Sequence, residues 1–129
     1  MTTHTLTATT VFASATVAAG TPSRSVVDLG LSHDGGYFTA KITNGATGPT
    51  VQGEIRILVA ASTSAQPNPA AAGVDWKTFR KVSGGTANSD VTEAVFEFGP
   101  GLRFVEVEVT GNTIQAITAE VLAFTYAYA

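Results

Sequence analysis

The feature that most constrains this chain is a two-residue alternation of apolar and hydrophilic side chains. From position 105 to position 109 every second residue is valine, and glutamates fill the positions between. Successive side chains of a β-strand point to opposite faces, so this pattern predicts a strand with one buried face and one wet face. The same alternation runs through residues 38–43, 51–59 and 117–124, the last of which is apolar on both faces. Helical periodicity is nearly absent.

Further segments dense in β-branched and aromatic residues are also predicted as strands. They are Thr9–Val17, Ser25–Leu29, Lys77–Val82 and Val91–Phe98. Clusters of glycine, proline and asparagine separate the strands and are typical of turns. About eight strands at this spacing predict an all-β fold, an antiparallel β-sandwich with a jelly-roll-like arrangement, rather than alternating strands and helices.

The length of 129 residues suits a single domain spanning residues 1–129. Residues 1–8 are predicted as a flexible N-terminal arm of that domain. Residues 61–74 are predicted as a long loop that leads into a strand. The first ten residues, MTTHTLTATT, lack the basic residue and the apolar run of a secretory signal, so we expect the chain to begin at Met1 and to fold where it is made.

The composition argues against several classes of partner and site. There is no cysteine, which excludes disulfides and thiolate zinc sites. The net charge is −3 and the only basic cluster is Lys77, Arg80 and Lys81, which is too little to predict nucleic-acid binding. No stretch approaches the ~18 consecutive apolar residues of a membrane span, so no membrane partner is predicted.

Charged residues are only 13% of the chain, against about 25% in a typical soluble domain. Threonine, serine, alanine and glycine take their place. The sequence therefore predicts a neutral, hydroxyl-rich surface, parts of which are apolar enough to meet a partner.

The stretch LSHDGGYF, residues 31–38, places serine, histidine and aspartate side by side. A Ser-His-Asp triad requires the base to reach the nucleophile and the acid to reach the base. Adjacent residues on extended backbone point to opposite faces, so Ser32 and Asp34 are not aimed at His33. Aspartate followed by two glycines is typical of a turn, and we predict a corner before a strand.

Glu106 and Glu108 lie two apart on one predicted strand and therefore share a face. Such a pair could serve a small hydrolase of the glycosidase type, but a solvated strand face, paired with Arg103 or Lys81, is the favoured interpretation. The chain has two histidines and no segment with the alternating oxygen ligands of a calcium loop. A calcium site assembled from separate loops stays open as an alternative. No catalytic residue, cofactor or metal ligand is predicted.

Phe124, Tyr126 and Tyr128 alternate along the last predicted strand and so share one of its faces. Aromatic residues are enriched at interfaces, and we predict these three residues, together with Trp76, as partner contacts. The alternative is that the row seals the core and that Trp76 plugs the core edge. Tryptophan and tyrosine also stack on sugars, so carbohydrate is kept as a possible partner of an adhesion module.

Several stretches follow one another in a recurrent order. They are GTPSRSVVDLG, GGYFTAKITNGATG, VQGEIRILVAAS, VDWKTF and FEFGPGLRFVEVEVTGNTIQAITAEVLAF. In rhythm and order, over residues 8–124, the chain resembles small virion structural proteins of tailed bacteriophages. No single motif carries this resemblance.

The resemblance implies a β-sandwich on the capsid exterior, a decoration or cement protein that is made in the host cytoplasm and resides in the virion. It further implies a homotrimer that binds the major capsid protein and stabilises the assembled head. A neck or tail position is an alternative. The family brings no catalytic residues, so the resemblance implies a protein that is not an enzyme.

Overall fold

The structure, a computed structural model, describes residues 4–20, 22–60, 76–110 and 113–128. These residues form strands and no helix, which confirms the predicted all-β class. The strands are β1 (His4–Val17), β2 (Ser23–Asp28), β3 (Gly36–Asn44), β4 (Glu54–Ala60), β5 (Trp76–Ser83), β6 (Val91–Phe98), β7 (Phe104–Thr110) and β8 (Ile117–Tyr128). None of the described residues belongs to a helix long and apolar enough to cross a membrane.

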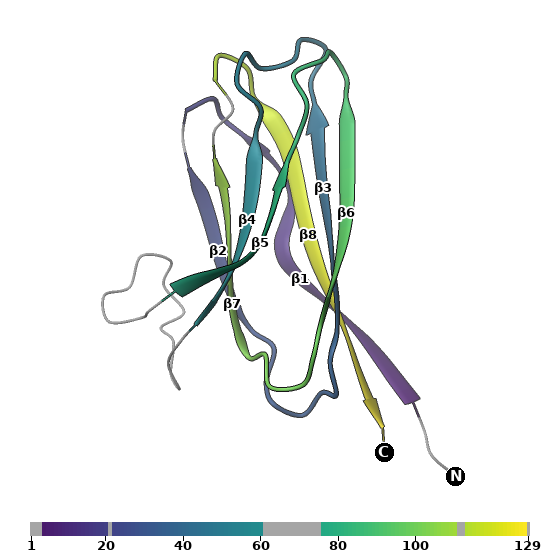
Figure 1. The fold of residues 1–129 in the computed structure, drawn as a ribbon. Helices are drawn as coiled ribbons and strands as arrows, with labels where there is room; N and C mark the ends of the chain where they lie inside the picture. The colour runs from purple at the N-terminus through teal and green to yellow at the C-terminus, as the bar shows by residue number, and fades with distance from the viewer. Residues whose placement is uncertain (1–3, 21, 61–75, 111–112, 129) are drawn as a thin grey trace.

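The strands form two four-stranded antiparallel sheets that pack face to face (Figure 1). One sheet has the strand order β1-β8-β3-β6 and the other has the order β2-β7-β4-β5. Only the β4–β5 connection joins neighbours within a sheet, since every other connection passes from one sheet to the other. This is the strand order of a jelly roll, so the predicted β-sandwich and its jelly-roll arrangement are both confirmed.

The core lies between the sheets and is built from the apolar positions of the alternating pattern. The valines at alternate positions of β7 and the isoleucines of β4 are fully buried. Burying one such side chain contributes about 1.5–3 kcal/mol relative to leaving it exposed. Both faces of residues 117–124 of β8 are apolar in sequence, but the two faces are not equally covered: the inward residues of this stretch are buried, whereas Leu122 and Phe124 on the outer face are half-buried.

The LSHDGG corner, residues 31–36, connects the start of β3 to neighbouring segments through hydrogen bonds of His33 and Asp34. The Nδ1 of buried His33 accepts a hydrogen bond from the Gly35 N–H (3.0 Å), so Nε2 carries the proton and donates to the Leu102 carbonyl (2.6 Å). The Asp34 carboxylate accepts a hydrogen bond from the backbone N–H of Tyr128 (2.9 Å). Both ring nitrogens of His33 are thus bonded to backbone groups, and the corner has a structural role.

Residues 4–8, predicted as a flexible arm, form the first part of β1 instead. Residues 4–10 pair with residues 122–128 of β8 without a register shift. Threonine is common in strands. Leu6 lies directly opposite Tyr126 of β8, and such cross-strand pairs stabilise a sheet. In Figure 1 this end of the β1–β8 pair extends beyond the other strands. The predicted loop 61–74 lies outside the described residues.

Gly36 marks the point where β3 passes so close to β8 that no side chain fits. A Cβ at this position would overlap the carbonyl oxygen of Phe124 and lie 3.0 Å from Cζ of Phe98. We therefore expect Gly36→Ala to lower the free energy of unfolding, measured in urea, by about 1–3 kcal/mol. In the control Gly99→Ala the new methyl group has no atom within 4 Å, and the change should stay within about 0.5 kcal/mol. Equal stabilities of the two variants would contradict this account.

Candidate functional site

An aromatic surface covers one end of the β1-β8-β3-β6 sheet, on the face turned away from the core. Phe124, Tyr126 and Tyr128 alternate with the inward residues Thr125, which is buried, and Ala127, which is half-buried. The register adds side chains from both neighbouring strands, since Leu6 lies opposite Tyr126 and Tyr37 lies opposite Phe124. We call the following six residues the aromatic face: His4, Leu6, Tyr37, Phe124, Tyr126 and Tyr128.

The rings of the aromatic face hold one another in place. Tyr37 and Phe124 are stacked, with centroids 5.0 Å apart and planes at 21°. His4 and Tyr128 make an edge contact at 4.4 Å, and Tyr126 and Tyr128 make another at 6.0 Å. Even so, Leu6 is 60% exposed and Tyr128 53% exposed. Ordered aromatic groups that remain exposed are typical of a surface on which a partner docks.

The structure thus brings together three of the four residues predicted as partner contacts. Phe124, Tyr126 and Tyr128 face away from the core, so the alternative that this row seals the core is wrong.

Trp76 begins β5 in the other sheet, opposite Ala60, and is half-buried. Its indole N–H is buried without a hydrogen-bond acceptor among the described residues. The sequence spacing revealed the β8 row, whereas Leu6 and Tyr37 could be found only from the strand register.

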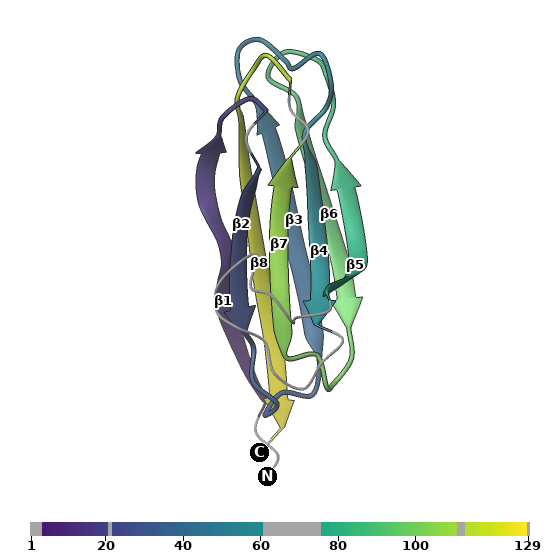
Figure 2. The ribbon, with the colours of Figure 1, turned by 90° about the vertical axis from the view of Figure 1, so that its left-hand side faces the viewer.

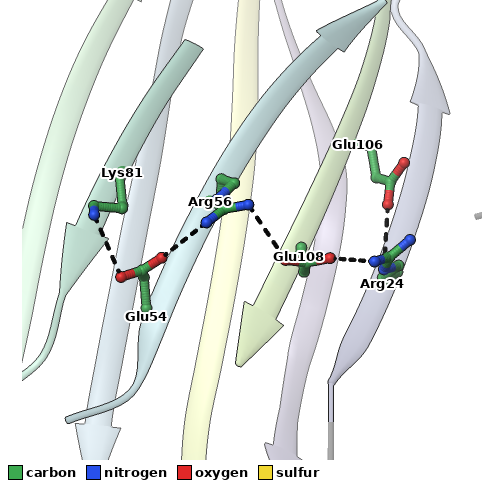
Figure 3. Close-up of polar contacts among 6 residues, drawn as sticks. All are labelled: Arg24, Glu54, Arg56, Lys81, Glu106 and Glu108. Carbon is green, nitrogen blue, oxygen red and sulfur yellow. Dashed lines mark ion pairs between the residues drawn. The ribbon is translucent and has the colours of Figure 1, made fainter. Parts of the chain in front are cut away.

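The outer face of the β2-β7-β4-β5 sheet carries a line of charged side chains, and Phe104 and Trp76 occupy outward positions at one end of it. Ion pairs cross all four strands in a line (Figure 3). From β5 to β2 they are Lys81–Glu54 (3.6 Å), Glu54–Arg56 (3.6 Å), Arg56–Glu108 (3.8 Å), Glu108–Arg24 (2.6 Å) and Arg24–Glu106 (3.6 Å). We call these six residues the ion-pair ladder. Each charge of the ladder lies within 4 Å of one of opposite sign, although the buried Nε of Arg56 has no hydrogen-bond acceptor among the described residues.

Glu106 and Glu108 share a face, as their spacing predicts, but Arg24 contacts both carboxylates. A substrate between the two glutamates would have to displace this guanidinium, so the pair does not have the open geometry of a glycosidase. The predicted solvated face is wrong for Glu106, whose side chain is only 3% exposed. In the register it lies between Val26 of β2 and Leu58 of β4, which explains its burial.

Burial raises the pKa of the Glu106 carboxyl above its ordinary value. The positive charge of Arg24 lowers that pKa, and the negative charge of Glu108 raises it further. On the same sheet, the hydrogen bond from Arg103 and the one from the Gly30 N–H lower the pKa of Asp28. Arg103 therefore pairs with Asp28 at 3.1 Å, and not with either glutamate.

A cavity of about 590 Å³ opens at the end of the sandwich where the β6–β7 loop lies. Its walls include Phe79, Phe98 and Phe104. Arg103 is the one charged side chain among its described lining residues, and it is paired with Asp28. Within the described ranges no group of three or more His, Cys, Asp or Glu side chains lies close enough together to hold a metal ion.

Comparison with known proteins identifies relatives of the fold. No protein-family model and no curated protein sequence matches the chain. Among solved structures it is similar to a Family 16 Carbohydrate Binding Module-2, with a TM-score of 0.50, 9% identity, and coverage of 84% of this chain and 74% of that one. It is also similar to a Yersinia pseudotuberculosis-derived mitogen, with a TM-score of 0.46, 12% identity, and coverage of 94% and 85%. At these identities the first likeness supports the β-sandwich fold alone.

The raised pKa of Glu106 predicts a specific pH dependence of stability. Because the folded state holds this proton more tightly than the unfolded chain, the stabilisation from Glu106 is full below the ordinary pKa of about 4.5 and is lost as the pH rises through the raised pKa. Glu106→Gln removes this titration. We therefore expect the free energy of unfolding of the wild type to fall relative to that of Glu106→Gln as the pH rises through this window, in urea titrations at several pH values.

The matched control is Glu93→Gln, which neutralises a side chain that is 67% exposed. This variant should retain the pH-dependent loss of stability that Glu106→Gln removes. Parallel curves for wild type and Glu106→Gln would contradict the assignment of a raised pKa to Glu106.

Proposed function

We propose that this chain is a non-enzymatic binding protein of a virion, a decoration protein that attaches to the assembled capsid through its aromatic face. The observation that carries the proposal is the set of fixed, exposed rings on the outer face of the β1-β8-β3-β6 sheet. The virion location rests on the resemblance of residues 8–124 to phage structural proteins. A neck or tail position is the alternative within that class.

The aromatic face has the properties of a docking surface. Its rings are already held by contacts with one another, so a partner loses little additional side-chain entropy when it binds. Leu6, Tyr126 and Tyr128 are all more than a third exposed and would lose that exposed area beneath a partner. Tyrosine is among the residues that most often dominate binding energy at interfaces.

The contacts of the side chains that could act in catalysis support a protein without enzymatic activity. Both ring nitrogens of His33 are occupied by backbone groups. Glu106 and Glu108 are bridged by Arg24. A protein that binds only the assembled shell stabilises it by mass action and needs no reactive group. The resemblance adds the major capsid protein to the proposal, as the partner of the aromatic face.

Carbohydrate binding is the second candidate, because the exposed tyrosines of β8 could stack on sugar rings. A flat sugar platform requires ring faces that are open and nearly coplanar. The planes of Tyr126 and Tyr128 cross at 75°, and Tyr37 and Phe124 cover one another's faces. Trp76 lies half-buried on the other sheet. This geometry favours docking onto a protein over stacking on a sugar.

The binding experiment uses virions made from the genome that encodes this chain, with its own gene deleted. Added wild-type protein should bind these particles and co-sediment with them. Replacing one dominant interface aromatic costs about 2 kcal/mol or more, which is roughly a 30-fold loss of affinity. We therefore expect the double variant Tyr126→Ser, Tyr128→Ser to bind at least that much more weakly while keeping the thermal stability of the fold.

The control is Val51→Ser, which removes a side chain that is 51% exposed in the β3–β4 loop, at the other end of the sandwich (Figure 1). It should bind as the wild type does. Wild-type protein that does not associate with the particles would overturn the virion proposal. Undiminished binding of the double variant would overturn the role of the aromatic face.

A glycan array separates the two candidates. The account expects no glycan to bind the wild type, and expects the fluorescence of Trp76 to be unchanged on addition of sugars. A glycan that binds the wild type and is lost in the Tyr126→Ser, Tyr128→Ser variant would establish the carbohydrate function in place of protein docking.

A further inference from the structure

The four edge strands of the two sheets differ in how they are protected. An edge strand presents unpaired N–H and C=O groups to other chains, and proteins commonly block such pairing with charged residues or proline. The edges β2, β5 and β6 all carry charges. These are Arg24 and Asp28 on β2, Lys77, Arg80 and Lys81 on β5, and Glu93 and Glu97 on β6. The fourth edge, β1, has 14 residues and contains no Asp, Glu, Lys, Arg or Pro.

β1 is also open over the part in which its register with β8 is regular. Among the described residues it pairs with β8 alone, and it lies at the left-hand edge in Figure 2. Residues 4–10 keep one register, whereas shifts follow between Thr10 and Phe12 and between Phe12 and Ala15. Within residues 4–10 every side chain is exposed except that of Thr9, which is half-buried. This segment is therefore a regular, neutral and accessible edge of seven residues.

We propose that residues 4–10 of β1 pair antiparallel with the same segment of a second copy of this chain, about a two-fold axis. Two identical strands are self-complementary in this arrangement, because each supplies the donors and acceptors that the other lacks. Identical strands also bring identical charges near one another, which disfavours pairing of two β5 edges with their lysines and arginine. β1 contains no Asp, Glu, Lys or Arg, so two copies of this strand can pair without repulsion between like charges.

Full overlap of the two segments fixes the register. The axis then passes midway between Thr7 and the partner's Thr7, and Leu6 faces the partner's Ala8. The two sheets join into one of eight strands, with the aromatic faces of both copies on the same side. The inference goes beyond the proposed function, since the pairing needs no capsid partner. It also gives a two-fold pair in place of the homotrimer that the resemblance implies.

Charge substitutions at Thr7 test the pairing and its register together. By light scattering at high concentration, the wild type should have about twice the chain mass of 13.2 kDa. Thr7→Lys and Thr7→Glu each place like charges opposite one another, so each variant alone should be monomeric. An equimolar mixture of the two should recover the doubled mass, because lysine then faces glutamate. Thr7 is exposed, so both variants should keep the fold, which circular dichroism checks.

The matched control is Val91→Lys, at an exposed position on the opposite edge strand β6, and it should stay dimeric. A monomeric or trimeric wild type, or a Thr7→Lys variant that stays dimeric, would overturn the pairing. Monomeric variants that fail to associate when mixed would overturn the Thr7 register. Thr7 and the tyrosines Tyr126 and Tyr128 lie on different faces of the β1–β8 pair, so loss of dimerisation and loss of virion binding are separate results.

Discussion

Burial of apolar side chains between the two sheets is the constraint on which the rest of this structure depends. The valines of β7 and the inward residues Ile117, Ala119, Val121 and Ala123 of β8 are fully buried, and their burial fixes which face of each strand points inward. A slip by one residue would expose this whole set of side chains to water. Because the inward positions fix the fold, the outward positions are left to carry other properties, and the two outer faces differ in what they carry.

On the β2-β7-β4-β5 sheet, the ion-pair ladder occupies outward positions on all four strands, and each of its charges has a partner of opposite sign. On the β1-β8-β3-β6 sheet, the outward positions near the termini form the aromatic face, which is ordered but only partly covered. Charges that are already paired gain little from a new partner, whereas the folded state gains free energy when exposed apolar area is covered. The difference between the faces is the physical reason to place binding on the aromatic one.

The sequence was sufficient to predict the strands and the sandwich, because the two-residue alternation depends only on neighbouring residues and directly determines which side chains point inward. It was also sufficient to place Phe124, Tyr126 and Tyr128 on one face. It was insufficient wherever the answer depended on a strand distant in sequence. Residues 4–8 look like a polar arm until β8 provides a partner for them, and Glu106 looks solvated until Val26 and Leu58 are placed on either side. Trp76 is predicted as a partner contact together with the tyrosines, but only the strand order reveals that it lies on the other sheet.

The central claim is that the aromatic face is the side by which this jelly roll attaches to an assembled particle. The most direct measurement is an electron cryo-microscopy map of virions made from the genome that encodes the chain. The account predicts density for the eight-stranded sandwich on the particle, with Tyr126 and Tyr128 turned toward the underlying shell protein. A map in which this face points to solvent, or one without density for the chain, would contradict it.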